Sequence, residues 1–241
     1  MITGIDSCPA GWFVFQLEKT DPGLFFDVVS SDEALLEVFR QSERVFIDIP
    51  MGISETENSR ACDLALREAL GREYRASVFA PPVRKALFAA GYREACDINK
   101  ACTGKMISKQ AWNICPKIRQ VDQLLRDEFE LRERVFESHP EYAFKMLNEG
   151  RALPHKKKTA EGKALRFQLL ADRIPGFDVA VEGIRKQFRR KDLGMDDVFD
   201  AAALALACKA SFFHGLKSLP ENPPFDATGR IMAIWVPGSF S

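Results

Sequence analysis

The chain has 241 residues, of which 46% are hydrophobic and 28% charged, and its 34 Lys and Arg residues balance its 34 Asp and Glu residues. This composition excludes a disordered or fibrous protein, and the zero net charge excludes a global field that would attract nucleic acid. No apolar run approaches the roughly 18 residues of a membrane-spanning helix, so we expect a cytoplasmic protein without a membrane partner. The six cysteines form no Cys-x-x-Cys pair, which predicts reduced thiols.

The first 50 residues have the pattern of an antiparallel meander followed by a crossover helix. Residues 1–6, 12–17 and 24–30 are rich in apolar, aromatic and β-branched side chains, and turn residues separate them, which predicts three strands. A helix capped by Ser31 or Asp32 should follow, because apolar residues then recur at helical spacing. Residues 44–49 follow as a strand that should lie parallel to the first.

The rest of the chain is mostly helical in pattern. The pattern over 59–130 predicts a largely helical insertion. A short strand is expected at 134–137, a helix at 141–147 and a buried helix at 196–213. A last strand at an edge of the sheet is expected at 230–236. We therefore expect a single α/β domain over 1–241, with a mixed five-stranded sheet and helices on both of its faces.

Three predicted strands end on or beside an acid: Asp6, Asp48 and Glu137 each follow apolar residues. An ionised carboxylate is costly to bury without a partner, and a shared cation would supply one. Ligand sites in such sheets gather at the carboxyl ends of parallel strands, where these acids would fall.

The helix predicted at 196–213 adds two acids. Asp197 and Asp200 are three residues apart and project from one face near its start, whereas Asp196 is better explained as a helix cap. Carboxylates in this number suit two Mg²⁺ or Mn²⁺ ions, which in phosphoryl transfer clamp the attacking and leaving oxygens. Spacing alone leaves open the alternative that these acids are scattered caps and surface residues.

Residues 151–191 carry 12 Lys and Arg against 4 Asp and Glu. This local surplus would attract nucleic acid if the helices there share a face. The alternative is a solvated helical surface without a partner.

These motifs resemble those of known nucleases. Gly4-Ile5-Asp6, the aspartate after the fourth strand and the run DVFDAAALA at 197–205 resemble the pattern of Holliday-junction resolvases of the RNase H-like superfamily. Nearly the whole chain is similar to a predicted RNase H-like nuclease family that has been described as a domain of unknown function. Residues 7–12 depart from the Pro-Gly turn that is usual after the first aspartate of the resolvases, so substrate contacts there would differ.

The resemblance implies an RNase H-like fold and a metal-dependent nuclease that hydrolyses phosphodiesters in DNA or RNA. Asp6, Asp48 and Asp200 would then hold Mg²⁺ or Mn²⁺, while Asp197 and Glu137 would be supporting ligands or a water-orienting base. Because resolvases work as dimers, the resemblance also allows a homodimer.

Four further residues are candidates for substrate binding. Lys109, Lys158 and Arg166 would neutralise phosphates beside the metals, and Gln110 would contact a base or sugar. The alternative for Lys157 and Lys158 is a solvated loop.

Two other functions remain open. An actin-like ATPase or sugar kinase shares the sheet and the first aspartate, but it needs further glycine-rich phosphate and adenosine loops, and residues 47–52 offer a single glycine. A non-catalytic RNase H-like binding module would keep the acids without turnover. Nucleotide titration would identify the first, and metal binding without cleavage would identify the second.

Overall fold

The computed structural model describes residues 1–57 and 59–239, which form two compact units. The first unit comprises Met1–Asp48, Glu133–Lys217 and Val236–Ser241, and the second comprises Ile49–Arg132 and Ser218–Trp235. The segment predicted as a helical insertion, 59–130, lies inside the second unit. The expectation of a single domain stays a prediction.

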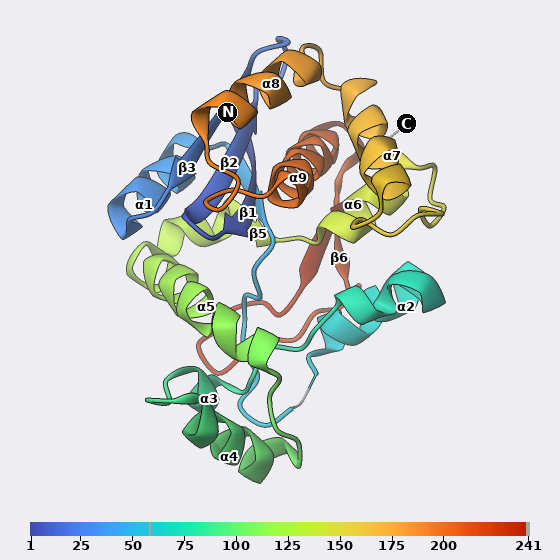
Figure 1. The fold of residues 1–241 in the computed structure, drawn as a ribbon. Helices are drawn as coiled ribbons and strands as arrows, with labels where there is room; N and C mark the ends of the chain where they lie inside the picture. The colour runs from blue at the N-terminus through green and yellow to red at the C-terminus, as the bar shows by residue number, and fades with distance from the viewer. Residues whose placement is uncertain (58, 240–241) are drawn as a thin grey trace. The chain divides into compact units, whose positions relative to one another are not determined.

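The first unit is built on a mixed sheet with the strand order β3-β2-β1-β4-β5 (Figure 1). β1 is antiparallel to β2, β2 is antiparallel to β3, and β1, β4 and β5 run parallel to one another. Five of the six predicted strands are therefore confirmed, and so is the mixed sheet. Their bounds are β1 Ile2–Cys8, β2 Gly11–Leu17, β3 Leu24–Val29, β4 Arg44–Ile47 and β5 Val135–Glu137.

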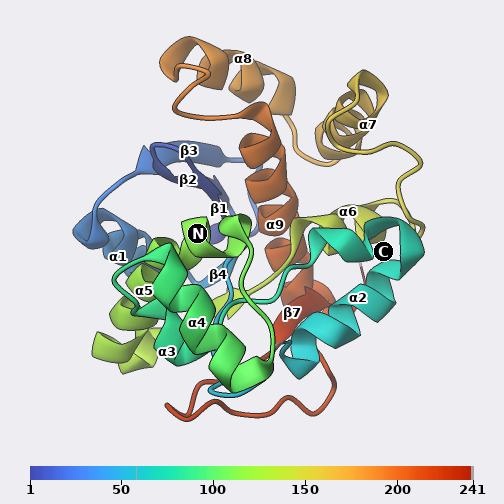
Figure 2. The same cartoon turned by 60° about the horizontal axis from the view of Figure 1, so that its bottom comes forward.

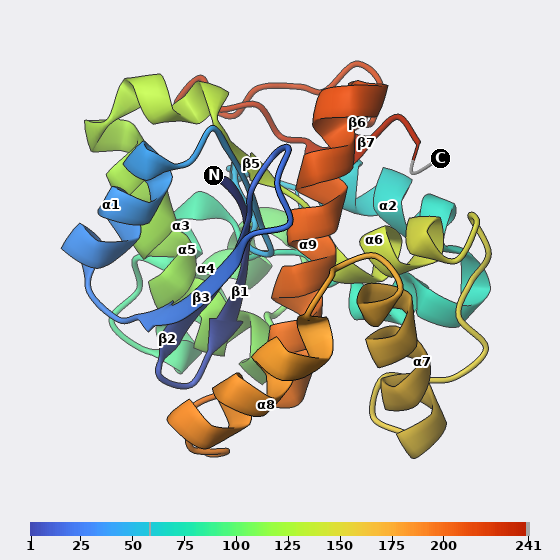
Figure 3. The ribbon, with the colours of Figure 1, turned by 90° about the horizontal axis from the view of Figure 1, so that it is seen from above.

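Helices cover both faces of this sheet, as expected. Figures 1 and 3 show α1 (Asp32–Gln41) on one side of the strands and α9 (Met195–His214) on the other. Ser31 caps α1 by accepting a hydrogen bond from the Ala34 amide. α9 is buried along most of its length because its interior is a run of alanines and other apolar residues.

Three more helices complete the first unit: α6 (Pro140–Leu147), α7 (Ala160–Ala171) and α8 (Phe177–Gln187). Figures 1 and 2 show α9 between the sheet and α7. An aromatic cluster holds α7, α8 and α9 together, with ring centroids 5.7–6.2 Å apart between the three phenylalanines Phe167, Phe177 and Phe199.

The second unit is largely helical. Its helices are α2 (Ala61–Tyr74), the 3₁₀ turn η1 (Arg75–Ser77), α3 (Arg84–Leu87), α4 (Tyr92–Thr103) and α5 (Lys109–Asp127), and a further 3₁₀ segment, η2 (Phe129–Glu133), follows α5.

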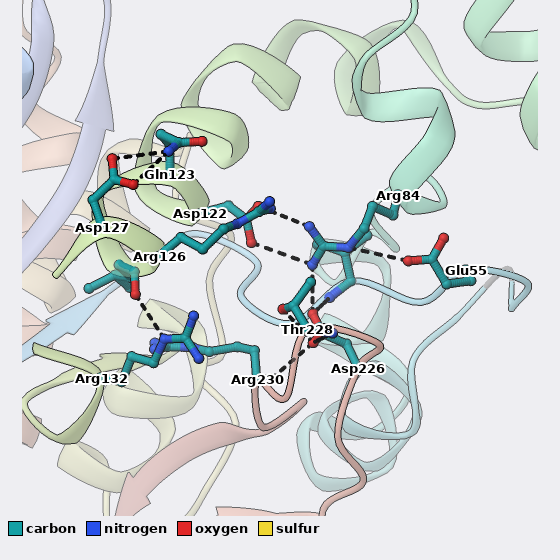
Figure 4. A network of polar contacts seen from close by, with 12 residues as sticks. Glu55, Arg84, Asp122, Gln123, Arg126, Asp127, Arg132, Asp226, Thr228 and Arg230 are labelled. Carbon is teal, nitrogen blue, oxygen red and sulfur yellow. Dashed lines mark hydrogen bonds and ion pairs between the residues drawn. The ribbon is translucent and has the colours of Figure 1, made fainter. Parts of the chain in front are cut away.

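Arg84 ties the distant segments of the second unit together (Figure 4). Its guanidinium donates to Asp226 Oδ2 at 2.6 Å and to Asp122 Oδ2 at 2.9 Å. Asp226 also accepts hydrogen bonds from the amides of Ile53 at 3.0 Å and Arg230 at 2.9 Å. Buried charges of this kind are stable only when each has partners, and here the partners fix residues 218–235 to the helices.

The prediction of an edge strand at 230–236 is wrong in its position. The strand there is β7 (Ile234–Pro237), and it pairs with β6 (Leu216–Leu219) in a separate two-stranded sheet. All six cysteines are reduced thiols, as expected. Within the described ranges, no helix is both long and apolar enough to cross a membrane.

Candidate functional site

Three acids lie at the carboxyl ends of neighbouring parallel strands. Asp6 lies near the end of β1, Asp48 directly follows β4, and Glu137 ends β5. The register pairs Ile5 with Ile47 and Ile47 with Glu137. It continues past the end of β4, because the Asp48 amide donates to the Ile5 carbonyl at 3.0 Å. The parallel pairing therefore brings these acids to one edge of the sheet, as their pattern predicted.

Gly4 allows α9 to pack directly on β1. A Cβ atom at Gly4 would lie 2.1 Å from the carbonyl oxygen of Ala201 and 2.3 Å from the amide nitrogen of Ala205, so any other residue would displace the helix. Asp6 points to the same face of the sheet as Gly4, because strand side chains alternate. Asp200 precedes Ala201 and so lies on the part of α9 that meets β1.

The acids raise one another's pKa. Burial raises the pKa of Asp6 well above its ordinary value, and the charges of Asp48, Asp200 and Asp197 add to the rise. Burial, together with Asp200 and Glu137, raises the pKa of Asp48 to about 8. Burial also raises the pKa of Asp200, and it is the main reason why the pKa of Asp197 is about 6. We call these five residues the acidic cluster.

One lysine lies within the acidic cluster. Lys157 Nζ is 2.9 Å from Asp200 Oδ2, and the charges of Asp200, Asp6 and Asp48 raise the pKa of Lys157 above its ordinary value although burial lowers it. The sequence made its exposed neighbour Lys158 a candidate for substrate binding, whereas Lys157 was not assigned a role in the site. The signal was present as a run of three lysines, but the run does not reveal which member points inward.

The donor chemistry of the acidic cluster fits a divalent cation. Carboxylate oxygens are the ligands that Mg²⁺ and Mn²⁺ prefer, and Asp200 Oδ1 is buried without a hydrogen-bond partner. However, among residues 1–57 and 59–239 no three His, Cys, Asp or Glu side chains are positioned to hold one metal ion. The acids therefore lie in one cluster, but their side chains do not surround a common point, and Asp200 is paired with Lys157.

The two acids of the first turn of α9 have different partners from those expected. Asp197 Oδ2 accepts a hydrogen bond from the Gly194 amide at 3.1 Å, so Asp197 makes the cap contact that the sequence suggested for Asp196. Asp196 instead lies 3.5 Å from Lys163 Nζ. The cap contact holds the carboxylate of Asp197 at the start of α9, beside the rest of the cluster.

Arg166 is buried against a sixth acid. Its guanidinium contacts both carboxylate oxygens of Glu141 at 3.0 and 2.7 Å, and Nη1 donates to the His155 carbonyl at 3.2 Å. Glu141 also acts on the cluster, since its charge contributes to the raised pKa of Asp48. Arg166 therefore holds Glu141 in place, and its contact with a substrate phosphate stays a prediction. Sequence reasoning did not assign Glu141 a role.

The other three predicted substrate-binding residues are exposed. Lys109 and Gln110 are exposed at the start of α5 in the second unit, where Lys109 Nζ lies 3.7 Å from the centroid of the Tyr92 ring. Lys158 is exposed in the first unit, just before α7. Their roles in binding stay predictions.

Comparison with known proteins gives a family without an assigned activity. Residues 4–224 match the family described as "Protein of unknown function (DUF429)". No curated protein and no solved structure matches the chain significantly. Because the match covers most of the sequence, the chain belongs to this family of proteins of unknown function.

Proposed function

We propose that the protein is a divalent-metal-dependent nuclease that hydrolyses phosphodiester bonds at the acidic cluster. The observation that carries this proposal is the gathering of acids from β1, β4, β5 and α9, which raise one another's pKa and include a buried carboxylate oxygen, Asp200 Oδ1, without a hydrogen-bond partner. Such a concentration of buried carboxylates is costly unless a cation binds them.

The residues in and around the cluster would have different roles in the reaction. Asp6, Asp48 and Asp200 would hold the cation, which when bound lowers the pKa of water and neutralises charge on the phosphate. Asp197, whose pKa of about 6 leaves its carboxylate ionised at neutral pH, is suited to accept a proton from the attacking water. Arg166 keeps Glu141 paired, so that this acid does not compete for the cation.

The surroundings of the cluster favour a polyanionic substrate. Basic side chains are exposed on the segment that ends α8 and precedes α9. The Ala10 amide donates to the Asp192 carbonyl at 3.0 Å, which fastens this segment to the turn after Asp6. Lysines and arginines there would bind backbone phosphates without regard to sequence. The exposed members are Arg185, Lys186, Arg189, Arg190 and Lys191.

The test is cleavage of single-stranded, hybrid and branched nucleic acids with added Mg²⁺ or Mn²⁺. We expect the wild-type protein to cleave at least one of them and Asp6→Asn to lose at least about a hundredfold of this rate, since a metal ligand is removed. Asp21→Asn, which changes an exposed acid in the same unit, serves as the matched control and should keep full activity. Failure of folded wild-type protein on all substrates with both metals would overturn the proposal.

A specific observation favours a second candidate, a non-catalytic binding module. Lys157 already pairs with Asp200, and no described triad of acids is positioned for a metal. A module of this kind would bind nucleic acid through the basic segment before α9 and would leave it intact. Retention of labelled nucleic acid without cleavage, equally in wild type and Asp6→Asn, identifies this function.

A further inference from the structure

The first unit contains a cavity of about 260 Å³ between three segments: the turn that joins β2 to β3, the turn that joins α7 to α8, and the last part of α9. Much of its lining is apolar. Leu17 and Ile174 are buried there, whereas the ring of Phe213 is 60% exposed. Cavities of roughly 300–1,000 Å³ hold drug-sized ligands, so this one suits a smaller molecule with an apolar body.

Backbone hydrogen bonds fix two of the walls. The Glu18 amide donates to the Gly23 carbonyl at 3.0 Å and closes the turn between β2 and β3. The Ile174 amide donates to the Leu170 carbonyl at 2.8 Å and holds the turn after α7. Because these walls do not have to be ordered by a ligand, binding to the cavity has a low entropic cost.

Two cations that line the cavity are held in place by neutral partners. Lys209 Nζ donates to the Glu18 carbonyl at 2.8 Å. Arg173 donates from Nη1 to the Leu169 carbonyl at 3.1 Å and from Nη2 to the Leu147 carbonyl at 2.9 Å. A carbonyl positions a cation without neutralising its charge. An ammonium group has three N–H donors and a guanidinium group five, so each cation keeps donors for an anion.

Asp21, which is exposed, is the one acid among the described residues that line the cavity, so the two cations leave an excess of positive charge. We propose that the cavity binds a small amphipathic anion, with an apolar ring system against the apolar lining and a carboxylate at Lys209 and Arg173. Hydrogen bonds between charged partners of this kind are stronger than those between neutral groups. The inference goes beyond the proposed function and does not depend on a metal at the acidic cluster.

The experiment is an NMR titration of the backbone amides of the full-length chain at neutral pH. The probe is naphthoate, which has two fused apolar rings and one carboxylate, and naphthamide is its uncharged counterpart of the same shape. We expect naphthoate to shift amides around the cavity, those of Leu206 and Phe213 among them, with a dissociation constant of about 1 mM or tighter. Naphthamide should bind about fivefold more weakly, because it cannot form the charged contact.

Four variants separate the shape of the cavity from its charge. Ala210→Trp places an indole ring in the cavity and should abolish binding of both probes. Lys209→Met and, independently, Arg173→Met should weaken naphthoate about fivefold and leave naphthamide unchanged. Lys156→Met removes an exposed lysine of the same unit that does not line the cavity, so this matched control should bind as wild type does. The amide spectrum of each variant without ligand verifies its fold.

The contrary results are distinct. Absence of shifts with several millimolar naphthoate overturns the inference, and so do shifts that persist in Ala210→Trp, because the probe would then bind elsewhere. Equal affinity of wild type for naphthoate and naphthamide, or an equal loss in Lys156→Met and Lys209→Met, overturns the role of the two cations. These results leave the proposed function of the acidic cluster standing, since none of them involves its residues.

Discussion

The ionisation of Asp48 affects the stability of the folded protein. An aspartate in an unfolded chain has a pKa near 3.9, and in the folded protein burial and neighbouring acids raise it to about 8. The folded state thus binds the proton more tightly. The stability that this provides is fully present below about pH 4 and is lost as the pH rises to about 8.

This predicts that Asp48→Asn is more stable than wild type at pH 8 without divalent metal. Asparagine cannot ionise, so the loss between pH 5 and pH 8 should be smaller by about 1–2 kcal/mol, a modest figure because Asp48 keeps some access to water. Urea unfolding at both pH values in the presence of a chelator measures it. Asp21→Asn should follow wild type, and an Asp48→Asn curve that also follows wild type would refute the prediction.

The sequence could predict some residues of the site but not others. Asp6, Asp48 and Glu137 could be chosen because each directly follows a run of apolar residues, a pattern visible without coordinates. Lys157 and Lys158 are identical in type and adjacent, and the sequence does not reveal that the folded loop places Lys157 on Asp200. The pairing of Arg166 with Glu141 also depends on tertiary structure, because 25 positions separate the two residues in the chain.

At the scale of elements, the contact between β1 and α9 positions the site. The bounds of α9 could be predicted because its apolar run is long, and the small side chains after Asp200 indicated close packing on the sheet. The strand expected at 230–236 was misplaced because β7 pairs with β6 in a separate sheet, and the local sequence does not reveal the partner of a strand.

Gly4→Ala should therefore separate α9 from β1. Its methyl group would overlap the backbone of α9, and we expect a loss of about 1–3 kcal/mol of unfolding free energy together with weaker Mn²⁺ binding, because Asp200 moves away from Asp6. Thermal unfolding and equilibrium dialysis measure the two effects.

Gly183→Ala in α8 is the matched control for this change. Its Cβ would lie at an ordinary 3.6 Å from Phe26 Cζ, so alanine should maintain or raise stability through its better helix propensity. Equal effects of the two substitutions would show that the close approach at Gly4 does not position the site.

At the scale of the molecule, the periodicity of apolar residues predicted the mixed sheet and the helical segment after β4. It did not predict that the chain divides into two compact units. Residues 218–235 return to the second unit because Asp226 meets Arg84, 142 positions earlier in the chain. No local pattern indicates so distant an ion pair. The five acids of the cluster likewise come from segments up to 194 positions apart, Asp6 and Asp200 being the extremes.

The most direct test of the central claim is the anomalous scattering of Mn²⁺ in crystals of the whole chain. We predict one peak in contact with the carboxylates of Asp6, Asp48 and Asp200, and no peak there in crystals of Asp6→Asn. Well-ordered wild-type crystals in saturating Mn²⁺ without a peak at these three residues would contradict the assignment of the acidic cluster as a metal site.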